Sequence, residues 1–167
     1  MAKLTYFSEL TPLMPILSRS SESLAPEDKW FKVYRLPYDV FAIFEPYHFQ
    51  EVISYLIIGS EEALLLDTGM GIGGNIRTLA ESLTKLPLVV VNTHSHFDHT
   101  GGDYLFDRVC LLDVPECITQ LSQGYTLPAD DENLSLEAYS YPGELWFDPA
   151  KIEVRPCNVI PVSEGHI

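Results

Sequence analysis

The chain of 167 residues has the length of one domain. Hydrophobic residues make up 46% of the sequence and charged residues 20%, so a sizeable core is available and a mostly disordered chain is excluded. The 10 Lys and Arg residues are outnumbered by 24 Asp and Glu residues, and the formal charge of -14 repels phosphate backbones. We therefore expect no nucleic-acid partner.

The cysteines indicate a reducing compartment. Cys110, Cys117 and Cys157 are odd in number and form no C-x-x-C pair, so neither a disulfide framework nor a thiolate zinc knuckle is predicted. The first residues lack the apolar run of a secretory signal, and the apolar segment 53–58 is far shorter than the roughly 20 residues of a membrane span. The expectation is a cytoplasmic protein without a membrane partner.

The first half of the chain is predicted to change from an irregular arm to a strand meander. Residues 1–30 mix prolines and serines, which favours turns, and we expect an N-terminal arm there. β-branched and aromatic runs separated by turn residues then predict strands over 31–36, 40–44, 52–58 and 63–66.

A helix and further strands are predicted next. Apolar residues recur at helical spacing from Ile72 to Leu86, with Asn75 as the candidate cap and Pro87 just past the end. The wholly apolar run 88–91 predicts a strand covered on both faces, paired in parallel through this helical crossover. The remaining expectations are a helix over 101–106, a strand over 109–113 and a loop-rich insertion over 114–150.

Four side chains of metal-ligand type follow directly after the 88–91 strand. They are His94, His96, Asp98 and His99. In an extended segment residues i and i+2 point to the same side, so His94 and His96 can bind one ion. The chain then turns, and Asp98 with His99 points to a neighbouring position. The spacing fits two metals.

A structural role is the alternative for any single histidine. A lone His is usually a hydrogen-bonded core or surface group, but three imidazoles within six residues would each need a partner if no ligand were bound. The cluster also follows a buried strand, and the carboxyl ends of strands in open α/β sheets are where ligands bind. Both points favour a metal site.

The histidine segment resembles the signature H-x-H-x-D-H of the metallo-β-lactamase superfamily of metal-dependent hydrolases. The resemblance extends upstream to Asp67-Thr68-Gly69 at the end of the 63–66 strand and downstream to Thr100-Gly101-Gly102, and it covers about residues 33–113. It implies an α/β fold, a four-layer αββα sandwich of two mixed sheets flanked by helices. Residues 31–167 would then form the amino-terminal part of such a domain.

The resemblance also implies roles for individual residues. His94 and His96 would belong to a first metal site, and Asp98 and His99 to a second. Asp67 would accept a hydrogen bond from a ligand imidazole, although an Asp before Gly69 is also a common turn former. Asp98 has a second candidate role, which is to handle the proton of the attacking water or the leaving group. The implied cofactors are two divalent metal ions, with zinc expected and iron or manganese as alternatives.

Some family features are missing from the sequence. The family completes its site with a third histidine, a bridging aspartate and a final histidine, and none of these is identifiable after His99. The later histidine, His166, is a weak candidate ligand because a terminal His is usually solvated. We therefore expect an incomplete sandwich, with a homodimer that shares ligands as the less favoured explanation. His48 lies in a predicted turn, where ordinary hydrogen bonding is the simpler interpretation.

The expected function is hydrolysis by metal-activated water of an ester, thioester, lactone or related small substrate. A β-lactam is least favoured because no export signal is seen. A noncatalytic metal-binding or partner-docking protein on the same fold is the first alternative. A dinucleotide-binding domain is the second, since Gly69-x-Gly71-x-x-Gly74 lies between a strand and a helix, but the acidic residue required roughly 20 positions later is absent.

Overall fold

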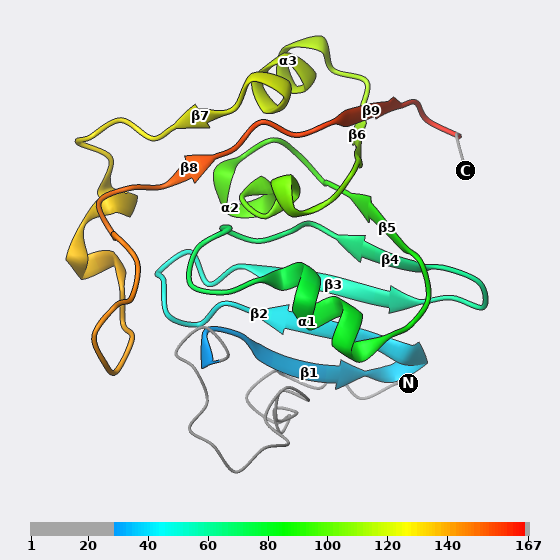
Figure 1. The fold of residues 1–167 in the computed structure, drawn as a ribbon, viewed down its shortest axis with the longest axis horizontal. Coiled ribbons are helices and arrows are strands. Elements are labelled where there is room, and N and C mark those ends of the chain that lie inside the picture. Colours follow the sequence, from blue (N-terminus) through cyan, green and yellow to red (C-terminus); the bar gives the residue numbers. More distant parts are fainter. Residues whose placement is uncertain (1–28, 166–167) are drawn as a thin grey trace, which may run out of the picture.

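The computed structural model describes residues 29–165 of the chain. The predicted arm over 1–30 falls almost entirely outside these residues, as does His166. The described part forms a seven-stranded mixed sheet in the order β1-β2-β3-β4-β5-β6-β9 and a separate pair, β7-β8 (Figure 1). The expected α/β class is confirmed.

The first four strands form an antiparallel meander, as the sequence predicts. In β4, Ala63 and Leu65 are buried while Leu64 and Leu66 are half-buried, as the two-residue period of a pleated strand requires. The strands are β1 Lys32–Leu36, β2 Val40–Phe44, β3 Ile53–Ile58 and β4 Ala63–Leu66, with the short 3-10 helix η4 Pro37–Asp39 between β1 and β2.

A parallel crossover follows the meander. Helix α1 (Ile76–Leu83) connects β4 to the parallel strand β5 (Leu88–Val91), as predicted. The helix begins after Asn75, whose side chain accepts a hydrogen bond from the Thr78 amide at 2.9 Å. It ends before the predicted Leu86, because Thr84 already has an extended conformation with φ of -141°.

The remaining elements differ from the prediction in two places. The helical turn expected over 101–106 starts earlier, as α2, and continues as the 3-10 helix η5, because the backbone at Gly101 and Gly102 packs directly against the turn after β4. The stretch expected to be loop-rich contains a helix, α3. The elements are α2 Phe97–Thr100, η5 Asp103–Leu105, β6 Val109–Leu112, α3 Pro115–Gln123, β7 Tyr125–Thr126, η6 Glu132–Leu134, η7 Leu136–Ala138, β8 Glu153–Val154 and β9 Val159–Val162.

The main core lies between α1 and one face of the sheet. Leu56, Leu65 and Val90 pack there with Ile76 and Leu79 of the helix, and Figure 1 shows α1 lying across the strands. Apolar side chains also project from the sheet at positions that remain exposed: Ile57 at 36%, Leu112 at 54% and Ile160 at 37%. Within the described residues the fold is thus one large mixed sheet with its helices, and the small β7-β8 pair beside it.

Within residues 29–165, no helix reaches the length and apolar character needed to cross a bilayer.

The Asn75 cap provides a test of the crossover. We expect Asn75→Ala to lower the free energy of unfolding by about 1 kcal/mol, because the Thr78 amide loses its acceptor. Asn75→Ser, which keeps a capping oxygen, should retain most of the stability in the same denaturant titration. Equal stability of the wild type and Asn75→Ala would show that the cap contributes nothing.

Candidate metal centre

The candidate site lies where the carboxyl ends of β4 and β5 meet. Because these strands are parallel, the turn formed by residues 67–70 and the segment 92–96 leave the sheet at the same edge. Helix α2 then returns to the turn: the Thr68 amide donates to the His99 carbonyl and the Gly101 amide to the Gly69 carbonyl, each at 2.8 Å. The turn and the helix are therefore fixed to each other through their backbones.

The predicted site residues come together on these segments. The ring centroid of His94 lies 4.6 Å from that of His96 and 4.2 Å from that of His99. Asp98 Oδ2 lies 3.2 Å from His99 Nε2. The three imidazoles and the carboxylate thus form one cluster, as the spacing in the sequence predicts.

Asp67 connects the cluster to the turn below it. Its carboxylate accepts hydrogen bonds from the Thr93 amide at 2.7 Å, from the Thr93 hydroxyl, and from His99 Nδ1 at 2.8 Å. The Asp67 side chain is only 6% exposed, and its backbone has a left-handed φ of 61°. This contact to an imidazole is the one that the family resemblance implies for Asp67.

The charges of the cluster are strongly coupled. Hydrogen bonds to the carboxylates of Asp67 and Asp98 raise the pKa of His99 to about 9. Burial and the neighbouring imidazoles of His99 and His96 lower the pKa of His94. Burial acts to raise the pKa of Asp98, but the hydrogen bond and charge of His99 outweigh it and hold this pKa below its usual range. Asp98 is therefore ionised at neutral pH.

The donor set fits a metal ion in type. Two donors that each lie about 2.0–2.2 Å from one tetrahedral ion are about 3.3–3.6 Å apart, whereas Asp98 Oδ2 and His99 Nε2 lie 3.2 Å apart and form an ion pair with each other. Asp67 holds the other nitrogen of His99, as outer-shell carboxylates do for ligand imidazoles. In the described part of the chain, however, no three His, Cys, Asp or Glu side chains are placed to hold one ion. The ligand assignments therefore stay a prediction.

The structure adds two buried acids that the sequence motif does not indicate. Glu45, which follows β2, accepts from the Trp30 indole at 2.6 Å and from the Met70 amide at 3.0 Å. Asp103, at the start of η5, accepts from the Thr68 hydroxyl at 2.7 Å. Burial raises the pKa of each carboxyl to about 7. Both carboxylates accept hydrogen bonds from the 67–70 turn, so both help to hold this turn in place beside the imidazole cluster.

His48 has the ordinary role that the sequence favours. It is 1% exposed, its Nε2 lies 3.3 Å from the Asn133 carbonyl, and its Nδ1 accepts from the Gln50 amide. Burial lowers its pKa. Both ring nitrogens therefore have protein partners at the fold's interior.

The glycines after β4 are explained by close packing. Gly69 and Gly71 both have φ of 69°, in the left-handed region. A Cβ at position 69 would overlap the carboxylate of Glu45, and one at position 71 would overlap the backbone of Gly101. These contacts account for the glycines without a dinucleotide.

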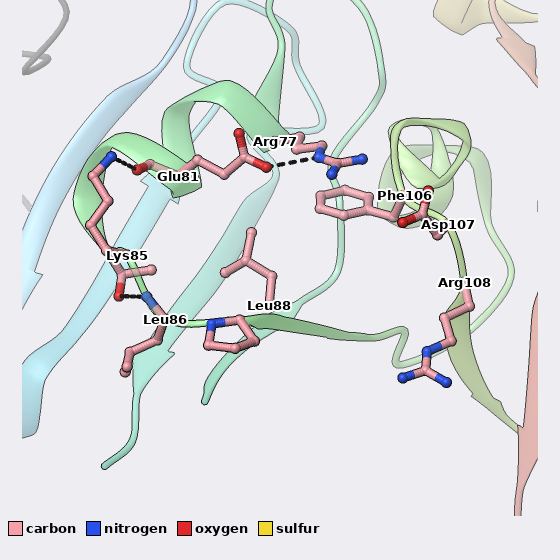
Figure 2. A pocket seen from close by; sticks show the side chains of 10 residues that line it. Arg77, Glu81, Lys85, Leu86, Leu88, Phe106, Asp107 and Arg108 are labelled. Carbon is pink, nitrogen blue, oxygen red and sulfur yellow. Dashed lines mark hydrogen bonds and ion pairs between the residues drawn. The ribbon is translucent and has the colours of Figure 1, made fainter. Parts of the chain in front are cut away.

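A pocket of about 600 Å³ lies away from the imidazole cluster. Figure 2 shows it between α1, the start of β5 and the segment that follows η5. None of the predicted site residues lines it. Its charged lining residues are Arg77, Glu81, Lys85, Asp107 and Arg108.

Comparison with known families identifies the chain. The sequence profile of the metallo-beta-lactamase superfamily matches residues 51–149, more than half of the chain. The chain belongs to the metallo-β-lactamase superfamily. The match includes the 67–70 turn, the imidazole cluster and α2.

The chain is also similar to individual members of the superfamily. The acyl-coenzyme A thioesterase MBLAC2 of Homo sapiens is 38% identical over 68 residues, which cover 34% of this chain and 24% of that protein. The probable metallo-hydrolase MJ0888 of Methanocaldococcus jannaschii is 41% identical over 59 residues, covering 33% of this chain and 27% of that protein. The matched region thus spans about a quarter of the length of these relatives.

One solved structure was matched as well. It is MEM-A1, a subclass B3 metallo-beta-lactamase isolated from a soil metagenome library, with 20% sequence identity and a TM-score of 0.43. The match covers 76% of this chain and 44% of that one.

The buried carboxyl of Glu45 makes the stability of the chain depend on pH. Its pKa is about 7 in the folded chain against 4.5 ordinarily, so the folded chain keeps a proton that the unfolded chain loses. The free energy of unfolding therefore falls as pH rises from 4.5 to 7. We expect Glu45→Gln to remove up to about 1.4 kcal/mol per pH unit of this fall, while the contribution of Asp103 remains.

Denaturant unfolding at several pH values in this range measures the slope. Glu51→Gln removes an exposed carboxyl and is the matched control, for which the wild-type slope is expected. A wild-type slope in Glu45→Gln would contradict the assignment of the proton to Glu45.

Proposed function

We propose that this chain is part of a metal-dependent hydrolase that uses a metal-activated water on an ester, a thioester, a lactone or a related small substrate. The observation that carries the proposal is the chain of contacts from Asp67 through His99 to Asp98. It holds an oriented imidazole nitrogen and an ionised carboxylate next to each other. Membership of the superfamily supports the reaction class.

The proposed ligands follow the pairs in the sequence. His94 and His96 would hold one divalent ion, and Asp98 and His99 would hold a second, with zinc expected and iron or manganese as alternatives. Bound there, such ions would lower the pKa of water towards neutrality and stabilise the oxyanion of the transition state. Further ligands would come from water or from residues beyond 29–165.

The protein's own groups would orient and move protons. Asp67 accepts a hydrogen bond from His99 Nδ1, which turns Nε2 towards Asp98 and leaves Nε2 as the nitrogen that would bind a metal ion once its proton is lost. Asp98 is ionised at neutral pH because its pKa is held low, so it can accept a proton from the attacking water. The same carboxyl can then return that proton to the leaving group. Asp98 is therefore the proposed catalytic residue.

A thioester is the favoured substrate class within this proposal. The similarity to a protein named acyl-coenzyme A thioesterase supports it, although that similarity covers a third of this chain. A thiolate leaving group also needs less protonation assistance than an alkoxide, because the pKa of a thiol is far lower than that of an alcohol. A small-molecule substrate is thus the proposed partner.

Metal binding tests the ligand assignment. We expect the double substitution His94→Ala and His96→Ala to abolish zinc binding at the first site, because both imidazole donors are removed. Zinc per chain, measured on dialysed protein, is the readout. His48→Gln, which changes a histidine outside the cluster, should keep the wild-type zinc content. Full stoichiometry in the double variant would refute the assignment.

Hydrolysis tests the reaction. We expect zinc-loaded protein to release free thiol from a short-chain acyl-coenzyme A, and Asp98→Asn to slow this release by about 100-fold or more. Asp113→Asn, an exposed aspartate on the segment after β6, is the control and should retain activity. Zinc binding without turnover of thioester, ester or lactone substrates would contradict the proposal and favour the noncatalytic metal-binding alternative.

A further inference from the structure

Asp103 lies beneath the candidate metal centre and is completely buried, with 0% of its surface exposed. One carboxylate oxygen accepts from the Thr68 hydroxyl at 2.7 Å, and the other accepts from the Asn92 side-chain amide at 2.6 Å. Thr68 follows β4 and Asn92 follows β5. Asp103 therefore joins the carboxyl ends of the two strands that deliver the site.

The two partners of Asp103 are the chain neighbours of the residues that hold His99. Thr68 directly follows Asp67, and Asn92 directly precedes Thr93, which donates to Asp67. The Thr68 amide also donates to the His99 carbonyl. A shift of either strand end would therefore move the carboxylate that accepts from His99, or the backbone of His99 itself.

We propose that Asp103 is a positioning residue that sets the orientation of the His99 imidazole by holding the ends of β4 and β5 together. Its effect on metal affinity rests on the proposed function, whereas its effect on the imidazole does not.

The amide of Asn92 depends on this contact. Among the described residues, Asn92 Oδ1 is buried and has no hydrogen-bond partner, so the bond from Nδ2 to Asp103 is what fixes the side chain. Removing the acceptor would leave a buried amide unsatisfied at both ends, and buried polar groups without partners shift or recruit water. The end of β5 would then lose its fixed relation to β4.

Two substitutions at position 103 differ in the hydrogen bonds that they can make. Leu has the same branched shape, with larger methyl groups in place of the carboxylate oxygens, and accepts no hydrogen bond. Asp103→Leu therefore removes the contacts from Thr68 and Asn92, together with the long contact from the Cys157 thiol at 3.9 Å. In Asp103→Asn the amide oxygen can accept from Asn92 and the NH2 group can donate to the Thr68 hydroxyl. That hydroxyl can then donate to the His99 carbonyl, which lies 3.3 Å away. The conservative variant should therefore preserve the connection.

The test first measures the metal-free protein by NMR. We expect the Nδ1 proton of His99, assigned by its absence in His99→Gln, to exchange slowly with water in the wild type and in Asp103→Asn. The same proton should exchange rapidly in Asp103→Leu. Leu56→Ala, which opens a cavity in β3 and lowers stability without touching this network, should keep the slow exchange. If Asp103 served only the stability of the fold, Asp103→Leu and Leu56→Ala would change the exchange rate of the His99 Nδ1 proton to the same extent.

Zinc affinity is the second readout. We expect Asp103→Leu to weaken it about 10- to 100-fold, as is usual for outer-shell substitutions, with Asp103→Asn and Leu56→Ala close to the wild type. If Asp103→Leu does not fold, Asn92→Leu removes the other contact of Asp103 without removing a hydrogen bond to His99, and it should show the same direction.

The outcomes separate the two proposals. A wild-type chain that binds no zinc would overturn the proposed function, and the NMR comparison would still decide the role of Asp103. Slow Nδ1 exchange in folded Asp103→Leu or Asn92→Leu would overturn the positioning role, as would equally rapid exchange in Leu56→Ala.

Discussion

The carboxylate of Asp67 is the contact on which the candidate site depends. It binds the backbone and hydroxyl of Thr93 at the end of β5 and the imidazole of His99 on α2, while its own backbone ends β4. Three segments are thereby joined at one buried group. Because the bond to His99 takes Nδ1, Nε2 is the nitrogen that faces Asp98. The charge pattern of the cluster follows from this single orientation.

Much of the fold could be predicted from local patterns. The β2 and β4 strands and the 88–91 strand agree with the prediction at both ends, because their apolar runs are bounded by turn residues. Helix α3 is not predicted, since its apolar face is short and consists of Cys117, Ile118 and Leu121. A start and stop signal was nevertheless present, with Pro115 at the first position and Gly124 just past the end.

The site could be predicted only as far as the motif extends. His94, His96, Asp98 and His99 are close in sequence, so their grouping follows from spacing alone. The supporting residues are not close: Glu45 contacts Met70 across 25 positions and Asp103 contacts Thr68 across 35. No local sequence pattern predicts that such an acid is buried, because its hydrogen-bond partner lies on a distant segment that becomes its neighbour only when the sheet forms. In the described residues no third donor is placed to share one ion with two members of the cluster, so the sequence motif alone does not complete a metal site.

The two buried acids explain how the turn after β4 keeps an unfavourable conformation. Asp67 has a left-handed φ of 61°, which costs a residue with a side chain about 1–3 kcal/mol and persists only where the surroundings enforce it. Glu45 holds the turn through the Met70 amide, and Asp103 holds it through the Thr68 hydroxyl. Each carboxyl loses its hydration when it is buried, and this loss raises its pKa. The hydrogen bonds to the turn offset part of that cost. The orientation of Asp67, and with it that of His99, is therefore a property of the surrounding fold and not of the histidine motif alone.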